Sequence, residues 1–249
     1  MTRLAELSTT AYAALLATKE VVVLLPVGSV EPHGPHLPLC TDTLISQGAA
    51  ALAAQQLTTG ERVAVIAPAV PYGVTDFAAG FAGAISVPAE VLTPFLNRIA
   101  AAFLADGAAH VCLVNNHLEP AQDAAVRAAL DGLPSGRASI ACPLSRRWGR
   151  TLSAEYKSGA CHAGQYETSL VLAVEPGLVD ERAAHGLPAS TLSLSEGIAA
   201  GKTTFKALGM DQAYTGSPAK ATREEGAEML ERLATMIVRE VVEGLESLG

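Results

Sequence analysis

Four side chains that can bind a metal ion lie close together near the start of the chain. They are Glu31, His33, His36 and Asp42, in the stretch LLPVGSVEPHGPHLPLCTDT at residues 24–43. The apolar run that opens this stretch is typical of a buried strand. Carboxylates and imidazoles without a thiolate suit Zn²⁺ or Mn²⁺. The stretch therefore predicts a metal site at the end of a strand.

Two further clusters contain the same residue types. VNNHLEP supplies His117 and Glu119, and CHAGQYET supplies His162 and Glu167. A single histidine near a strand end is more often a hydrogen-bonded structural residue than a ligand. Four of the six histidines, however, fall in these three clusters together with acids. This coincidence favours a metal site over three unrelated structural histidines.

The remaining histidines, His110 and His185, lack such neighbours. We interpret both as structural residues.

The spacing within the clusters indicates a site for two ions. Glu31 and His33 are two positions apart, as are His117 and Glu119. In an extended chain this spacing puts both side chains on one side. Asp42 has two carboxylate oxygens and can bridge two ions, which in paired sites lie roughly 3.5–4 Å apart. Such a pair supplies hydroxide near neutral pH and polarises a carbonyl, so hydrolysis is the predicted reaction.

The elements that would position these residues follow a β-α-β-α order. The apolar runs predict strands at 21–28, 62–69, 110–116 and 138–144. Helical patterns lie at 43–57, 88–107 and 120–133, a further helix is expected from about Gly164, and a last long one is expected to open at Ser217-Pro218. Continuous apolar strands are typical of a parallel sheet with helices on both faces. We predict a single α/β domain over residues 1–249, with the three clusters at the carboxyl edge of its sheet.

Two segments, 71–86 and 185–216, have no clear period. Long loops in compact domains are usually functional or lie at interfaces.

The composition excludes several classes of partner. The net charge is −8 and no run of Lys or Arg stands out, which argues against nucleic acid and anionic membranes. No apolar stretch is long enough to cross a membrane. With 49% hydrophobic residues, we expect a large core and apolar subunit interfaces. The cysteines form no paired framework, which favours reduced thiols in a cytoplasmic protein.

Other catalytic motifs are weaker. Ser29 lacks the flanking glycines of a nucleophile elbow, and no phosphate-binding or dinucleotide motif occurs. Cys161 beside His162 could be a thiol nucleophile with its base. Neighbouring side chains point in different directions, however, so we favour a packed or rim cysteine.

The motifs as a whole resemble those of the creatininase family, the creatinine amidohydrolases and their relatives. LPVGSVEPHGPHLPLCTDT resembles the family signature, and the likeness continues through FAGAIS, LVNNHLEP, CHAGQYETSLVLAVEPGLV and GSPAKATREEGAEML. The resemblance covers nearly the whole chain. It implies a creatininase-like parallel-sheet α/β fold, assembled as a homohexamer. It also implies a dinuclear Zn or Mn site that hydrolyses a non-peptide C–N bond of a small amide.

The resemblance also implies residue roles. Glu31 and His117 would bind one ion, His33 and Glu119 the other, and Asp42 would bridge them.

Three further residues fall on characteristic positions of the family. Glu167 would be a ligand or would orient one, and His36 would support the ligands. A metal-bridging hydroxide would attack the amide or lactam carbonyl. His162 would then donate a proton to the leaving nitrogen, with Glu119 as a second catalytic candidate.

Departures from the family pattern bear on the substrate. Pro32 stands where the family has Gln and Cys40 where it has Gly. The creatinine-hydrolysing members close tryptophans over their substrate. This chain has only Trp148, and Ser158 stands where an aromatic residue is expected. Creatinine is therefore disfavoured as the substrate.

Alternatives to a small-amide hydrolase remain open. The chain could be a deformylase acting on a ribosylaminopyrimidine, or a peptidase acting on a modified-peptide precursor. A phosphorylated substrate would need a basic pocket. Arg146, Arg147 and Arg150 are the local basic cluster, for which we favour a solvated or interface position. A catalytically silent metal-binding scaffold is argued against by the intact ligand set.

Overall fold

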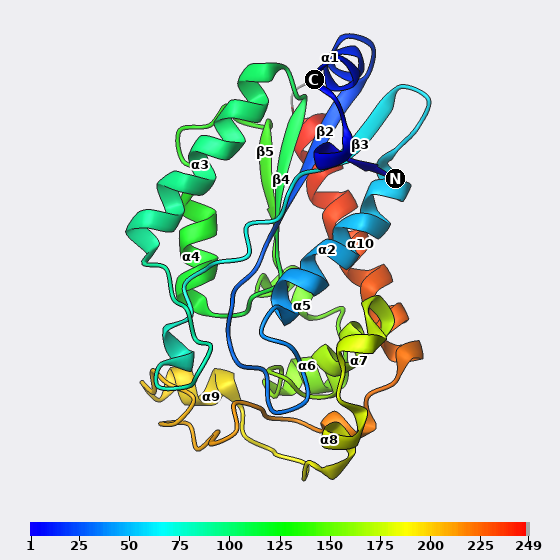
Figure 1. Ribbon diagram of the computed structural model, residues 1–249. Coiled ribbons are helices and arrows are strands. Elements are labelled where there is room, and N and C mark those ends of the chain that lie inside the picture. Colours follow the sequence, from blue (N-terminus) through cyan, green and yellow to red (C-terminus); the bar gives the residue numbers. More distant parts are fainter. Residues whose placement is uncertain (248–249) are drawn as a thin grey trace.

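The apolar runs of the sequence form one parallel sheet. In the computed structural model, which describes residues 1–247, five strands lie in the order β1-β3-β2-β4-β5, and every neighbouring pair is parallel (Figure 1). The strands are β1 (Thr2–Arg3), β2 (Glu20–Val27), β3 (Arg62–Ile66), β4 (His110–Asn115) and β5 (Ala138–Ala141). The predicted fold class is confirmed. The sequence pattern missed β1, because two residues are too few to show a period.

Helices cover both faces of this sheet. Along β2, Val22 and Leu24 point into one core cluster and Val23 and Leu25 into the other. The first cluster is closed by α2 (Thr41–Leu57), α7 (Gln165–Val174) and α10 (Arg223–Glu246). The second is closed by α1 (Thr9–Thr18), α3 (Ala89–Asp106) and α4 (Pro120–Ala128). Burial on both sides explains why the strands read as continuous apolar runs.

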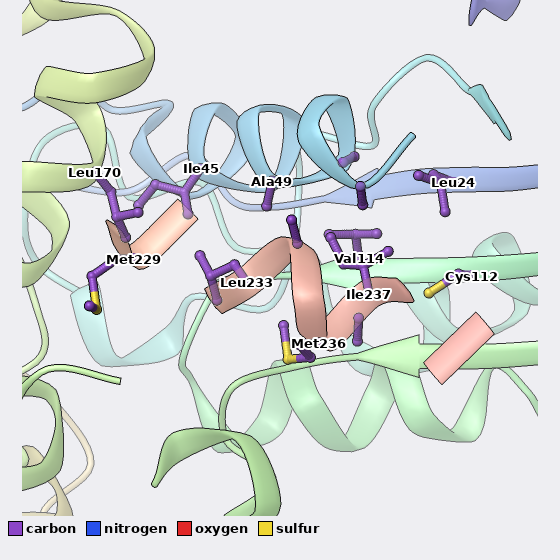
Figure 2. Close-up of a cluster of buried hydrophobic side chains, with 14 of the residues drawn as sticks. Leu24, Ile45, Ala49, Cys112, Val114, Leu170, Met229, Leu233, Met236 and Ile237 are labelled. Atoms are coloured by element: carbon purple, nitrogen blue, oxygen red, sulfur yellow. The ribbon is translucent and has the colours of Figure 1, made fainter. Parts of the chain in front are cut away.

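The first cluster holds the helix that carries much of the site. Figure 2 shows Ile45 and Ala49 of α2 facing Leu233 and Ile237 of α10, with Leu24 of the central strand beside them. Full burial of a leucine or isoleucine side chain stabilises the fold by about 1.5–3 kcal/mol. The position of α2 against the sheet is therefore fixed by packing.

The start of the last helix differs from the prediction for an identifiable reason. The last helix does not open at Ser217-Pro218, because residues Pro218–Lys220 form a separate 3-10 turn. The helix α10 begins at Arg223, where the Thr222 hydroxyl accepts a hydrogen bond from the Glu225 amide at 3.1 Å. Thr222 and Glu225 have the spacing of a capping box, which is the stronger start signal.

Strands β3 and β5 end earlier than predicted. A proline follows each of them, Pro68 and Pro143, and a proline has no N–H to donate to a neighbouring strand.

The two segments without a clear period pack against each other. Segment 71–86 contains a 3-10 turn at Asp76–Ala78, and segment 185–216 contains α9 (Leu194–Ala199). The Phe205 amide donates to the Phe77 carbonyl at 2.7 Å, and both rings belong to a small apolar cluster. The other short helices are α5 (Arg146–Gly149), α6 (Ala154–Ser158) and α8 (Glu181–Gly186). Among the helices of residues 1–247, none combines the length and apolarity that crossing a membrane requires.

Candidate metal centre

Asp42 stands at the centre of the site, in the first turn of α2. Its carboxylate is 1% exposed. The Oδ1 atom lies 3.3 Å from Nε2 of His33, and Oδ2 lies 3.1 Å from Nδ1 of His117. The Ser29 hydroxyl donates to Oδ2 at 2.6 Å. Each carboxylate oxygen of Asp42 therefore faces a different imidazole.

The close approach of β2 to α2 depends on Gly28. A Cβ atom at this position would lie 2.6 Å from the backbone nitrogen of Thr43. The absence of a side chain lets the chain that leaves β2 run against the start of α2. This contact brings residues 29–33 beside Asp42.

Two groups of possible metal ligands share Asp42. Glu31, Asp42 and His117 form one group, and His33, Asp42 and Glu167 form the other, with the ligand atoms of each group within 4.8 Å of one another. Oε1 of Glu31 lies 3.2 Å from Nδ1 of His117, and Oε2 of Glu167 lies 3.6 Å from Nε2 of His33. This arrangement has room for a cation on either side of Asp42. In residues 1–247 one further group of this kind exists, formed by Glu31, His33 and His162.

Hydrogen bonds fix which nitrogen each imidazole turns to the acids. Nε2–H of His117 donates to the Val74 carbonyl at 2.7 Å, and Nδ1–H of His33 donates to the Glu31 carbonyl at 3.1 Å. The other nitrogen of each ring faces the acids and is the atom that a metal ion would bind. Histidine ligands are commonly oriented in this way by a second acceptor.

The unpartnered nitrogen of His33 tests whether the site fits a cation. His33 is fully buried, and its Nε2 has no hydrogen-bond partner. Burial would lower the pKa of His33, but the carboxylates of Asp42, Glu167 and Glu31 outweigh burial and raise the pKa to about 10. A field that holds a proton this strongly also attracts a metal cation. The donor set therefore fits the two divalent ions that the sequence predicts.

The two acids nearest the imidazoles are ionised. Burial would raise the pKa of Glu31 and of Asp42. His117 nevertheless holds the pKa of Glu31 below its usual range, and His33 and His117 do the same for Asp42. Glu31 also accepts a hydrogen bond from the Thr75 hydroxyl. Ionised carboxylates are the form that binds metal.

Glu119 lies apart from both ligand groups. It precedes α4, and its carboxylate accepts hydrogen bonds from the amides of Asp76 at 3.1 Å and Phe77 at 3.2 Å. The resemblance pairs Glu119 with His33, but the structure brings Glu167 to that place instead. Burial raises the pKa of Glu119 to about 7, so this carboxyl group can exchange a proton near neutrality.

Glu167 is held by an unusual turn. Its Oε2 accepts a hydrogen bond from the Ala163 amide at 2.7 Å, and Ala163 has a φ of 51°. A non-glycine residue in the left-handed region is uncommon and is found preferentially at functional sites. Burial raises the pKa of Glu167 to about 8.

His162 lies between the metal ligands and the cavity. Its ring centroid is 4.4 Å from that of His33 and 4.3 Å from that of Phe205. Nε2–H donates to the Pro32 carbonyl at 3.0 Å, so Nδ1, 3.9 Å from Oε1 of Glu31, is free. Burial and the neighbouring His33 lower the pKa of His162 to about 4, which keeps the ring neutral.

His36 lies behind the ligands. Its Nε2 bonds the Thr168 hydroxyl at 2.8 Å, which links the segment after β2 to α7.

A cavity of about 610 Å³ opens over the ligands. Its floor includes Glu31, Asp42, His117 and Glu167. Its apolar wall draws on both irregular segments and on the turns after β4 and β5: Phe77, Leu118, Leu144, Leu194, Ile198 and Phe205.

Two residues that the sequence analysis considered for catalysis or substrate binding, Cys161 and Trp148, do not have these roles in the structure. Cys161 lines the cavity, but burial raises the pKa of its thiol to about 12, so it is not a nucleophile near neutral pH. Trp148 is buried, and its indole N–H donates to Glu240 at 2.5 Å. Trp148 does not line the cavity.

The sequence missed residues that orient the ligands. Ser29 is fully buried and bonds Asp42, and Thr75 bonds Glu31. Neither carries a recognisable ligand motif. The position of Ser29 just after β2 could have indicated its role, because side chains there lie at the edge of the sheet that holds the site. Nothing in the sequence around Thr75 indicates a role, because its segment has no clear period.

Comparisons with known proteins agree with the geometry. The family model described as creatinine amidohydrolase matches residues 5–241. A mycofactocin precursor peptide peptidase of Mycolicibacterium smegmatis is 31% identical over 88% of this chain and 85% of its own length. The creatinine amidohydrolase of Pseudomonas putida is 26% identical over 70% of this chain and 72% of its own length.

A solved structure shows the same fold. A creatininase described with Mn superposes with a TM-score of 0.79, at 23% identity and over 98% of both chains. Because the family model and the relatives span most of the sequence, the chain belongs to the creatininase family of hydrolases.

Proposed function

We propose that this chain is a two-metal hydrolase that cleaves an amide C–N bond of a peptide or peptide-derived substrate. The observation that carries the proposal is the position of Asp42, whose two oxygens face the histidines of two different ligand groups. Carboxylate and imidazole ligands around a shared carboxylate suit a pair of Zn²⁺ or Mn²⁺ ions.

The ligand assignment follows the two groups. Glu31 and His117 would hold one ion, His33 and Glu167 the other, and Asp42 both. When bound, the ions would supply an activated water and polarise the carbonyl of the substrate. Glu119 is proposed as a proton acceptor on the cavity wall rather than as a ligand.

Two residues would handle protons. Glu119, whose pKa burial raises to about 7, would take a proton from the attacking water. His162 turns its unprotonated Nδ1 toward the ligands, where it would accept this proton from Glu119 and pass it on to the leaving nitrogen. A positioned acid or base of this kind typically contributes about 100-fold to 10,000-fold in rate.

The cavity favours a peptide over a small ring. A volume of about 610 Å³ falls in the range that surrounds a drug-sized ligand, about 300–1,000 Å³. The relatives at about 31% identity are named as peptidases acting on a precursor peptide. A small cyclic amide is the second candidate, because the relative from Pseudomonas putida is named as a creatinine amidohydrolase.

The metal proposal is tested by metal analysis of the purified chain and of two variants. The wild type should contain two transition-metal ions per chain. Asp42→Ala should lose both ions and turnover, whereas His162→Asn should keep the ions and lose turnover. Asp106→Asn, at the exposed end of α3, is the matched control and should change neither. A wild type with no stoichiometric metal would contradict the proposal.

The substrate class is tested with the metal-loaded enzyme on two panels. One panel contains short peptides and the other contains creatinine and simple lactams. Turnover of peptides alone supports the first candidate, and turnover of creatinine alone would replace it with the second.

A further inference from the structure

Three cationic side chains form one wall of the cavity. They are Arg146 of α5, Arg150 directly after it, and Lys157 of α6, and all three line the cavity. We call these residues the basic wall. In the part of the chain that the structure describes, none of the three forms an ion pair or a side-chain hydrogen bond. Their charges are therefore available to a molecule in the cavity.

The direction of the basic wall follows from helix geometry. Arg146 and Arg150 are four residues apart, a spacing that places two side chains on the same face of a helical turn. Arg147, between them, takes the other direction. Its guanidinium bonds the Glu243 carboxylate at 2.7 and 2.5 Å and lies 4.3 Å from the centre of the Trp148 ring. The basic cluster of the sequence is thus divided between a surface ion pair and the cavity.

The charges of the cavity leave the basic wall without a partner. The acids that line the cavity are Glu31, Asp42, Glu119 and Glu167. Three of them belong to the two ligand groups, and the fourth is held by two backbone amides. Two divalent cations would balance all four carboxylates. The basic wall then remains as local positive charge in a chain whose net charge is −8.

We propose that the basic wall binds carboxylate groups of the substrate and so selects acidic peptides. This inference rests on the proposed peptide hydrolysis and adds which peptides are chosen. A guanidinium offers paired N–H donors that match a carboxylate. Leu144, Leu194 and Ile198 line the same cavity and would hold apolar side chains of the peptide. The amide to be cleaved lies over the ligands while the carboxylates contact the basic wall.

The test measures binding separately from turnover. Three labelled probes are titrated with metal-loaded protein by fluorescence anisotropy: acetyl-Glu-Glu-Ala-Leu-Phe-amide, its Gln-Gln counterpart, and the Gln-Gln peptide with a free carboxyl terminus. Tighter binding of the first probe than of the second assigns the basic wall to acidic side chains. Tighter binding of the third than of the second assigns it to a terminal carboxylate. Equal binding of all three overturns the proposal.

Variants connect this preference to the basic wall. In Arg146→Gln/Arg150→Gln the acidic probe should bind about 10-fold to 100-fold more weakly, because charge-assisted hydrogen bonds are lost. The neutral probe should bind unchanged. Lys157→Gln should give a smaller loss, and Arg147→Gln is the control that should bind all probes like the wild type.

Metal content separates this proposal from the one on which it rests. If the basic wall only balances the acids of the ligand groups, the double variant will lose metal affinity and bind all probes alike, which overturns the proposal. If the chain binds acidic probes selectively but hydrolyses no amide, the proposed function fails while the assignment of the basic wall stands.

Discussion

Ser29 shows how much of the site depends on residues that touch no substrate. Its hydroxyl donates to Oδ2 of Asp42, the same oxygen that faces His117. Since Ser29 is fully buried, no water can replace this hydrogen bond. The orientation of Asp42, and with it the spacing of the two ligand groups, depends on this contact.

We expect Ser29→Ala to weaken metal binding without unfolding the chain. Loss of a partner that orients a ligand typically lowers metal affinity about 10-fold to 100-fold. Metal titration followed by calorimetry measures the change. Ser139→Ala is the control, because Ser139 lies in β5 and its hydroxyl bonds His110, away from the ligand groups. If both variants bind metal equally well, Ser29 does not orient Asp42.

The choice between Glu119 and Glu167 marks the limit of sequence reasoning at this scale. Both acids follow a histidine at a strand exit or turn, Glu119 by two positions and Glu167 by five, and neither spacing shows which carboxylate reaches His33. The backbone separates them: the amides of Asp76 and Phe77 hold Glu119 on the cavity wall, and the turn at Ala163 brings Glu167 to His33. Neither the amide directions nor the φ of Ala163 has a signature in residue types.

The packing of α7 on α10 sets the position of Glu167. Gly226 lies at their contact, where a Cβ atom would come within 1.8 Å of the Ser169 carbonyl oxygen. That oxygen belongs to the backbone of α7 and cannot turn aside. Any side chain at position 226 must push the two helices apart, and α7 carries both Glu167 and Thr168, the partner of His36.

We therefore expect Gly226→Ala to lower both stability and metal affinity. Overpacking of this kind costs about 1–3 kcal/mol, even though alanine favours helix formation. Thermal unfolding with and without added metal measures both effects. Gly186→Ala is the control, since a Cβ atom there meets nothing within 4 Å. Unchanged stability of Gly226→Ala would show that the helix pair accommodates a methyl group.

Long elements were predictable and the short ones were not. Apolar runs in the sequence predict the strands β2, β3, β4 and β5. The helical period predicts the helices α2, α3, α4, α7 and α10. The short helices and the start of α10 depend on single caps and turns. The start of α10 is set by the capping pair Thr222 and Glu225 rather than by Ser217-Pro218.

The stability of the whole molecule should depend on pH through His110. This residue is fully buried at the start of β4, away from the site, and bonds the Gly136 carbonyl at 2.9 Å and the Ser139 hydroxyl at 2.8 Å. These two hydrogen bonds agree with the prediction that His110 is a structural residue. Burial lowers its pKa to about 4, so the folded chain keeps the ring neutral.

The sign of the effect follows from this shift. The unfolded chain has the ordinary histidine pKa of about 6.5 and takes up a proton that the folded chain refuses. The contribution is therefore present above about pH 6.5 and is lost as the pH falls toward 4. Urea unfolding at pH 7 and pH 5 should show a drop that is smaller in His110→Gln than in the wild type. An identical drop in both would exclude His110 as its source.

Assembly into a homohexamer stays a prediction from the family resemblance. Several large apolar side chains are exposed and lie in the segment before α3 and on α3 itself: Tyr72, Ile85, Val91 and Phe95. They agree with the expectation from composition that apolar surface is reserved for subunit contacts.

The segment of residues 74–77 has a consequence for how such a chain can change in evolution. The Val74 carbonyl orients His117, and the amides of Asp76 and Phe77 hold Glu119. Every residue except proline offers a backbone N–H, so the exposed position 76 can change its side chain while its amide still reaches Glu119, whereas the buried side chain of Val74 is constrained by packing. Only Thr75 contributes through its side chain, to Glu31. Selection on this stretch would act mainly on its backbone conformation. Insertions or deletions would therefore disrupt the positions of His117 and Glu119 far more than most substitutions would.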